Sequence, residues 1–384
     1  LVARFVGSGE REDAETAVRQ SLLLIVAVAA CFAVGLFVLK RPLLAAQGLS
    51  GAALDEGERY LAWAAAGLPF TFLNFVQAGA FRGLGDTVRP FWVTLGSNLV
   101  YALLNALLIP GNLGFPKMGI AGGALAMACS QVAAVALQQW FLRRGPLGGA
   151  FSGAPRVDPA WIRRIAKVGL PAGGQQLLRT GSMLLSQNLL ARRAGDVAVA
   201  ALGVGLVAES LAFMPGFGYA IAASAFVGQN LGAGNPRRAA ASAWIATGQA
   251  VAVMTLAGLL FFALAEPFAR LFVHVTPQMP PDEAARAHEQ IRLVVLYLRI
   301  ALFSEPFLAL AMVLSGALQG AGETLSPTIL VAVTSILVRL PLGWLLLGAY
   351  GVPGAWWAMT LSTILQGILV VAIFHAGRWQ KAKV

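Results

Sequence analysis

The sequence predicts an all-α polytopic membrane protein from three features: an apolar composition, a series of long apolar blocks and an internal repeat. Of the 384 residues, 58% are hydrophobic and only 12% are charged, whereas about 25% are charged in an ordinary soluble domain. So few charges cannot cover the core that such a chain would form in water, so most of its surface must face lipid. This composition excludes a disordered chain and a secreted disulfide scaffold.

The net charge of +11 does not indicate a nucleic-acid partner. The Lys and Arg residues lie mostly in short connectors between apolar blocks, where basic residues orient membrane spans. We therefore expect the lipid bilayer, and no nucleic acid, as the large-scale partner. His274, His288 and His375 lack the spacing of metal ligands, so we expect neither a metal site nor a cofactor.

Ten apolar blocks are long enough to cross a bilayer as helices, which requires about 20 residues each. They are continuous, without the alternation of outer-membrane strands, and this favours helices over a barrel. The blocks lie near residues 20–39, 60–81, 90–110, 119–142, 166–191, 197–227, 240–264, 291–318, 327–347 and 351–375.

The loop charges predict how these spans are oriented. With ten spans, the segment before the first span and the loop after every second span share one side. That side carries 16 Lys and Arg residues, Lys383 included, and the other side carries 9. The richer side is predicted to be cytoplasmic. We thus expect a multi-pass protein of the cell (inner) membrane with a cytoplasmic C-terminus.

Residues 79–90 reappear as residues 316–327, with six of twelve positions identical. Two further landmarks repeat in the same order: residues 2–14 match 227–239, and 119–122 match 351–354. Generic glycine-rich membrane turns are the alternative explanation. Three landmarks in one order, at similar offsets, favour a true internal repeat.

The repeat predicts the domain organisation. Residues 1–145 form an N-terminal bundle of four spans, 146–165 a basic cytoplasmic linker, and 166–384 a C-terminal bundle of six spans. Two spans of the second repeat have no counterpart in the first, so the chain is predicted to be an N-terminally truncated part of a twelve-span protein. Its two six-helix bundles would be related by a pseudo-two-fold axis along the membrane normal.

Several motifs resemble those of multidrug and toxic compound extrusion (MATE) transporters. They are Gly83-Leu84-Gly85-Asp86-Thr87 with Pro90, its copy at residues 320–324 with Pro327, residues 227–234, and Gly169-Leu170-Pro171. The resemblance covers nearly the whole chain. It implies a cation-coupled antiporter, driven by H⁺ or Na⁺, that exports cationic or amphiphilic drugs and other toxic organic compounds by alternating access. Small organic cations or amphiphiles are the expected partners, and we expect a monomer.

Positions that hold the coupling ion in the family carry other residues here. Arg179 stands where one branch of the family has a glutamate, eight residues after Pro171. Tyr101 and Asn105 stand where another branch has an Asn and an Asp. The resemblance therefore leaves the choice between H⁺ and Na⁺ open.

Four charged residues stand out deep inside apolar blocks: Arg179, Glu209, Glu305 and Arg339. A charge at mid-membrane costs at least about 2.5 kcal/mol, so each is a candidate for ion coupling. Arg179 and Glu209 are equally far from the turn between their spans, as are Glu305 and Arg339. In an antiparallel pair of helices such residues lie at the same depth, so we predict two ion pairs. These pairs could equally serve only to lock helices together.

Glu209 has the strongest claim to a functional role. It precedes Pro215 and Gly216, which are expected to break the helix and free backbone carbonyls near a cavity. We predict that Glu209 takes up and releases a proton during export, with Arg179 tuning its pKa.

Amide and aromatic side chains supply candidates for the substrate cavity: Gln77, Tyr101, Asn105, Gln176, Asn188 and Phe213. The amides would bind substrate or, as is more common, hydrogen-bond between helices. Phe213 would stack on a cationic drug or pack in the core. Gly79 with Gly83, and Gly316 with Gly320, have the small-xxx-small spacing of close helix packing.

Other functions fit the sequence less well. A lipid-linked oligosaccharide flippase of related architecture is the main alternative, but it would need a more cationic cavity. An enzyme would need clustered His, Asp or Cys within the spans, and nucleotide hydrolysis would need a phosphate-binding loop. Neither pattern occurs, so we expect no enzyme activity. A channel suits a two-fold repeat with charged spans less well than alternating access does.

Overall fold

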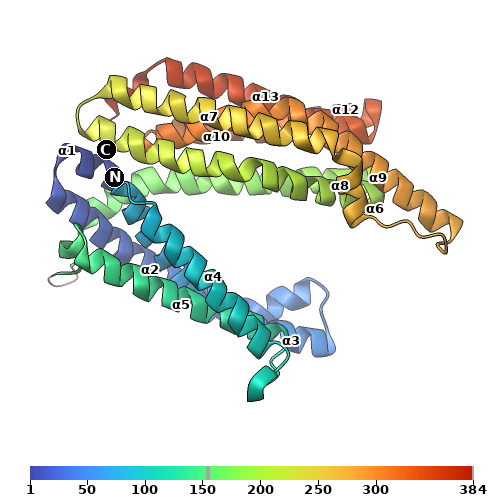
Figure 1. Ribbon diagram of the computed structural model, residues 1–384, viewed down its shortest axis with the longest axis horizontal. Coiled ribbons are helices and arrows are strands. Elements are labelled where there is room, and N and C mark those ends of the chain that lie inside the picture. The colour runs from blue at the N-terminus through green and yellow to red at the C-terminus, as the bar shows by residue number, and fades with distance from the viewer. Residues whose placement is uncertain (153–155, 383–384) are drawn as a thin grey trace. The chain divides into compact units, whose positions relative to one another are not determined.

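The computed structural model describes residues 1–152 and 156–382, and these fold almost entirely into helices, without a strand. They form two compact units, residues Leu1–Ile165 and Ala166–Val384 (Figure 1). Residues 153–155 of the predicted linker, and residues 383–384 with Lys383, lie outside the described residues. The pseudo-two-fold relation between the two bundles stays a prediction.

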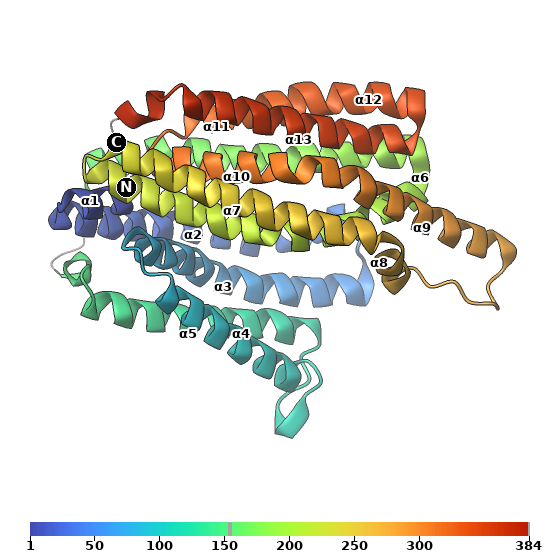
Figure 2. The same cartoon turned by 45° about the horizontal axis from the view of Figure 1, so that its top comes forward.

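The N-terminal unit contains α1 (Val2–Ser8), α2 (Arg11–Ala46), α3 (Gly51–Gly83), α4 (Val88–Leu108) and α5 (Ile120–Arg144), with short 3₁₀ turns η1 (Asn112–Gly114) and η2 (Gly148–Phe151). Helix α3 packs against both α2 and α5, and α4 packs against α5 (Figure 2). Arg19 of α2 donates hydrogen bonds to the carbonyls of Gly149 and Ala150. These bonds hold η2, the segment after α5, against α2.

The C-terminal unit is built on α6 (Pro159–Gly232), whose first residues lie in the N-terminal unit. It continues with α7 (Pro236–Ala263), α8 (Ala265–Phe272), α9 (Pro281–Ala301), η3 (Leu302–Ser304), α10 (Glu305–Gly320), α11 (Leu325–Ala332), the π-helical η4 (Val333–Val338), α12 (Arg339–Tyr350), α13 (Val352–His375) and η5 (Arg378–Lys381). Helix α10 packs against α7 and α13, and α13 packs against α12. The largest core cluster, which includes Met254, Leu314 and Val370, fills the space between them.

The ten predicted spans are all present. Nine helical stretches of the described residues are long and apolar enough to cross a membrane. One of them, α6, contains two spans, because Gly195 adopts φ 76° and ψ −176° and interrupts the helix. The predicted all-α polytopic fold is therefore confirmed.

The internal repeat is visible in the backbone. Gly85 and Gly322 take the same left-handed conformation, with φ 83° and 87°. The amide of the following residue, Asp86 or Glu323, donates a 2.9 Å hydrogen bond to the carbonyl five residues earlier. Each acidic side chain then accepts a hydrogen bond from a backbone amide of the next helix. Asp86 and Glu323 are thus equivalent helix caps, which explains the conservative exchange between the copies.

The other two landmarks also match in conformation. Gly9 and Gly234 both end a helix with positive φ, 80° and 70°. Gly119 and Gly351 precede α5 and α13 with φ 56° and 65°. Residues that carry a side chain rarely adopt these positive-φ backbone conformations. The repeated glycines therefore allow the same turns in both copies.

The predicted close packing at small residues holds for three of the four glycines. A Cβ atom at Gly316 would lie 2.5 Å from the carbonyl oxygen of Ala220, and one at Gly320 would collide with the carbonyl of Ser224. Gly83 is packed against Val2 in the same way. Gly79 is the exception, since a Cβ atom there would meet, among the described residues, only a guanidinium nitrogen of Arg82 at 4.0 Å.

The predicted helix break at Pro215 is wrong. Helix α6 continues through Pro215 to Gly232. A proline removes only one backbone donor, and the buried Gly216 beside it lets the side chain of Met254 pack closely. The irregular backbone lies instead at η3 and η4, which directly precede Glu305 and Arg339.

Candidate functional site

Polar side chains from four helices meet in the C-terminal unit around a cavity of about 80 Å³. We call it the Glu209 cavity. Helix α6 supplies Glu209, α9 supplies Tyr297, α12 supplies Arg339, and α13 supplies Thr360 and Thr363. Apolar side chains such as Leu206 and Trp356 complete the lining.

The carboxylate of Glu209 is held by a tyrosine. The hydroxyl of Tyr297 donates a hydrogen bond to Glu209 Oε2. Gly205, one turn before Glu209 on α6, makes room for this ring, because a Cβ atom there would lie 2.7 Å from Tyr297 Cε1. Trp356 meets the ring edge-on, with centroids 5.2 Å apart. Tyr297 is therefore fixed on both sides while it binds the acid.

Arg339 is anchored beside the same cavity by neutral groups. Its Nε donates to Ser362 Oγ at 2.8 Å, and its Nη2 donates to Thr363 Oγ1 at 3.1 Å. Both hydroxyls donate in turn to the carbonyl of Met359. The guanidinium is thus fixed in position, and its charge acts on Glu209 without a direct ion pair.

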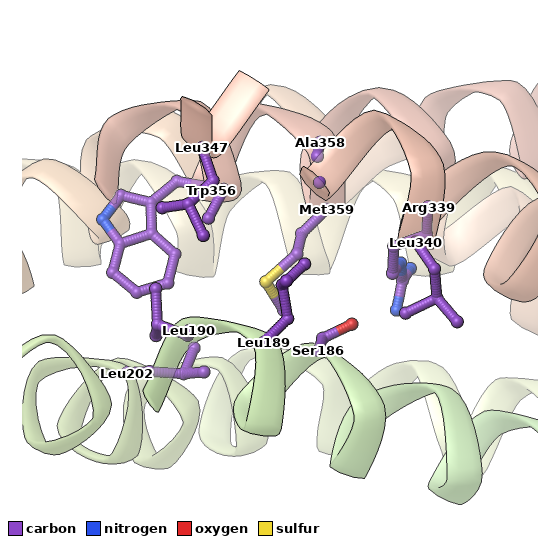
Figure 3. A pocket seen from close by; sticks show the side chains of 12 residues that line it. Ser186, Leu189, Leu190, Leu202, Arg339, Leu340, Leu347, Trp356, Ala358 and Met359 are labelled. Atoms are coloured by element: carbon purple, nitrogen blue, oxygen red, sulfur yellow. The ribbon is translucent and has the colours of Figure 1, made fainter. Parts of the chain in front are cut away.

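Arg339 also borders a second, smaller cavity of about 20 Å³. Figure 3 shows Arg339 facing Ser186 of α6 at one end, with Met359 between them and the apolar part of the cavity. Leu190, Leu202 and Trp356 line that apolar part. The two cavities share Arg339, so the charged group lies at the boundary between a polar and an apolar space.

Glu305 is a second acid close to Glu209. It begins α10 and is only 3% exposed, and its Oε2 atom has no hydrogen-bond partner among the residues that the structure describes. Its neighbour Ser304 lines the Glu209 cavity. The two carboxylates are near enough for their charges to interact. The first turn of α10 offers Glu305 the favourable end of a helix dipole.

The predicted ion pairs, Arg179 with Glu209 and Glu305 with Arg339, are wrong. Within the described residues no nitrogen–oxygen distance of 4.0 Å or less joins either pair. Equal distance from a turn places two residues at the same depth in the membrane. It does not determine which side of its helix each residue occupies. Glu209 faces Tyr297 of α9, and the arginine whose charge acts on it is Arg339.

Arg179 does not line the Glu209 cavity, although Met183, one turn further along α6, does. Arg179 lies on α6 between Gln175, which accepts a hydrogen bond from Gln319, and Ser182, which donates one to the carbonyl of Ser335. Its half-buried side chain has no hydrogen bond or ion pair with any residue in 1–152 or 156–382.

The cavity candidates on α6 do not gather at the Glu209 cavity. Gln176 and Asn188 are both exposed. Phe213 packs against the large core cluster of α6, α7, α10 and α13, as its alternative interpretation predicts.

Of the candidates in the N-terminal unit, Gln77 lies on α3 about one turn from Asn74, which belongs to an amide network. Asn74 donates to Gln131 at 2.8 Å and accepts from Gln138 at 2.6 Å. Gln77 is 1% exposed, and its carbonyl oxygen has no partner in the described part of the chain. The same holds for the buried carbonyl oxygen of Asn105, while Tyr101 is exposed.

The sequence reasoning missed Tyr297, Ser362 and Thr363. Each lies in a predicted span, and a lone tyrosine or a Ser–Thr pair among apolar residues is a weak signal by itself. A hydroxyl near a mid-membrane charge was nevertheless to be expected, because charged groups in spans pair with polar neighbours.

An all-α polytopic chain with a charged cavity inside one helical bundle has the architecture of a secondary transporter. The chain belongs to the MatE family, whose model matches residues 1–107 and 171–345. It is therefore a multi-pass membrane transporter and not an enzyme.

Relatives with known names are similar over most of the chain. A probable multidrug resistance protein NorM from Thermotoga maritima is 28% identical, covering 88% of this chain and 70% of the relative. Its counterpart from Mesorhizobium japonicum is 30% identical, with the same coverage. A FAD transporter from Shewanella oneidensis is 26% identical over 96% of this chain and 78% of its own.

Solved structures share the fold. The Vibrio cholerae MATE transporter VcmN in its bent form has a TM-score of 0.86 at 20% identity, covering 99% of this chain and 82% of its own. A MOP superfamily transporter from Pyrococcus furiosus has a TM-score of 0.86 at 21% identity, covering 100% and 83%.

Proposed function

We propose that this transporter is a multidrug exporter that exchanges cationic or amphiphilic organic compounds for protons. Its relatives include multidrug resistance proteins. The observation that carries the proposal is the Glu209 cavity, which a tyrosine-bound carboxylate and a fixed arginine both line, with a second buried acid close enough for its charge to act on Glu209. Glu209 is the residue that takes up and releases the proton.

The charges of this site favour a proton over sodium. With Glu209 and Glu305 both ionised and Arg339 charged, the cluster carries one net negative charge. One added proton makes it neutral, which is the favoured state in a low-dielectric interior. A sodium ion would have to bind next to the Arg339 guanidinium, which repels it.

Competition at this cluster would give exchange. A cationic substrate nearby stabilises the ionised acids, whereas a proton removes the negative charge that attracts the substrate. Each ligand therefore lowers the affinity for the other. Alternating access then carries the proton inward and the substrate outward.

Proteoliposomes loaded with a fluorescent cationic dye test this proposal, with proton and sodium gradients imposed separately. We expect the proton gradient alone to drive export, and Glu209→Gln to abolish it. Glu266→Gln is the matched control, because this acid is exposed and pairs with Arg270 on the surface. Sodium-driven export, or full proton-driven export by Glu209→Gln, would contradict the proposal.

We also propose that the transporter works as a monomer in the cell (inner) membrane with its C-terminus in the cytoplasm. The bias of 16 basic residues against 9 supports this orientation. Reporter fusions at the C-terminus test it, since a fusion active only outside the cytoplasm would reverse the topology. Purified protein that elutes as a dimer would contradict the monomer.

A further inference from the structure

We propose that Arg179 binds an oxyanion, the carboxylate or phosphate of an amphiphilic ligand, at a site in the C-terminal unit separate from Glu209. The inference rests on the proposed export activity. It extends the substrate class to compounds that carry a negative group as well as an apolar body.

Arg179 lies on the face of α6 that contacts other helices of its own unit. Gln175, Arg179 and Ser182 are spaced as i, i+4 and i+7, which places them on one side of a helix. Gln175 is linked to Gln319 of α10 at 2.8 Å, and Ser182 to the backbone of Ser335 in η4. Because both neighbours are tied to the bundle, the residue between them is directed toward it too.

Arg179 is also far from both ends of its span. With a rise of 1.5 Å per residue, it lies about 20 Å from residue 166 and about 18 Å from residue 191, the two ends of the span. The side chain is half-buried. An aqueous interface is therefore out of easy reach, and the guanidinium needs a partner where it lies.

The described part of the protein supplies no negative partner. No carboxylate of residues 1–152 or 156–382 lies within 4.0 Å of Arg179. The charged side chain that acts on it is Arg339, which has the same sign. Glu209, the nearest acid along the chain in the next span, is already bound by Tyr297. Arg179 is therefore a charged group that lacks a direct negative partner among these residues, and an anion from outside the chain would supply one.

The available donors suit an oxyanion. A guanidinium presents parallel N–H groups that match the two oxygens of a carboxylate or phosphate. Gln175 accepts through its carbonyl oxygen, so its NH₂ group stays available one turn away. This chemistry fits the negative group of a transported amphiphile and also a lipid phosphate, and the experiment below separates the two sources.

A pair of matched dyes tests the proposal: a rhodamine with a free carboxylate and its methyl ester. Binding to the purified transporter is measured in neutral phosphatidylcholine nanodiscs, without any ion gradient. We expect Arg179→Gln to weaken binding of the acid about ten-fold, the usual effect of losing a charge-assisted hydrogen bond, and to leave the ester within about two-fold. Arg179→Lys, which keeps the charge, should lose less than Arg179→Gln.

Arg299→Gln is the control, because Arg299 is exposed in the same unit and contacts the ring of Phe262. Arg299→Gln should leave the binding of both dyes unchanged. Inorganic phosphate should displace the acid from the wild-type protein, a readout that needs no variant. Equal weakening of both dyes by Arg179→Gln, or no weakening of either, would overturn the proposal.

A second arm adds phosphatidylglycerol to the nanodiscs. If this lipid displaces the acid from the wild-type protein, the oxyanion at Arg179 is a lipid headgroup; if it does not, it belongs to the transported compound. Because the assay measures binding alone, a failure of proton coupling leaves its result unchanged. If the wild-type protein shows no proton-driven export but its binding of the acid still depends on Arg179, the proposed function is refuted and the Arg179 site is not.

Discussion

The ring of Tyr297 lies directly over Gly205, one helical turn before the carboxylate that its hydroxyl binds. Any side chain at Gly205 would overlap the ring. The glycine therefore sets the distance between α6 and α9 at the point where Glu209 is held. A residue without functional groups thus positions the acid of the Glu209 cavity.

Gly205→Ala is expected to push the Tyr297 ring away from α6. Overpacking of a well-packed interior costs about 1–3 kcal/mol, and the Glu209 hydrogen bond is lost as the ring moves. The thermal midpoint of unfolding and the rate of proton-driven dye export should both decrease. Gly203→Ala is the control, since Gly203 is exposed and a methyl group added there would have no atom within 4 Å. Equal losses in both variants would refute the contact.

Tyr297→Phe removes only the hydroxyl. An O–H donor stabilises the ionised carboxylate, so without it Glu209 should release its proton less readily. The pH at which dye export is half-maximal should therefore move upward. Tyr219→Phe is a suitable control, because Tyr219 packs against the large core cluster. An unchanged pH profile in Tyr297→Phe would show that the hydroxyl plays no part in proton release.

Glu305→Gln tests whether the second acid contributes charge. Once this acid is replaced by a neutral amide, the charges of Glu209 and Arg339 cancel each other. The site is then neutral without an added proton and binds the proton less favourably. Proton-driven export should therefore decrease relative to the wild type. Thermal stability should change little, because glutamine has nearly the same shape. Normal export with the same stability would remove Glu305 from the mechanism.

Gly320→Ala is expected to destabilise the C-terminal unit by at least about 1–3 kcal/mol, because the methyl group would collide with the backbone of Ser224. Gly79→Ala, in the equivalent motif of the first repeat, meets only the flexible end of Arg82. It should leave the thermal midpoint nearly unchanged. If both variants unfold at the same temperature, close packing at Gly320 is not what holds α10 to α6.

Much of the fold follows from the sequence. Bilayer thickness fixes the length of a span, so ten apolar blocks could be counted, and turns such as those at Gly85 and Gly322 could be matched. The pairing of buried charges did not follow. Arg179 and Glu209 share a depth, but which face each presents depends on packing such as that of Tyr297 on Gly205. A glycine seen as a sequence letter does not reveal which ring it accommodates.

Local backbone irregularity was also out of reach. Pro215 predicts a helix break, but α6 continues there, with Met254 packed closely against Gly216. The π-helical turn before Arg339, in contrast, has no proline within residues 333–338. The polar partners of Arg339, Ser362 and Thr363, come from the last span, and their proximity depends on tertiary structure.

The most direct test of the central claim is proton movement caused by the substrate itself. Proteoliposomes without sodium, and with equal pH on both sides, receive a cationic dye gradient while a pH indicator reports the lumen. Wild-type protein should move protons against the dye, and Glu209→Gln should move none. Dye flux without proton movement in the wild type, or unchanged proton movement in Glu209→Gln, would contradict proton exchange at the Glu209 cavity.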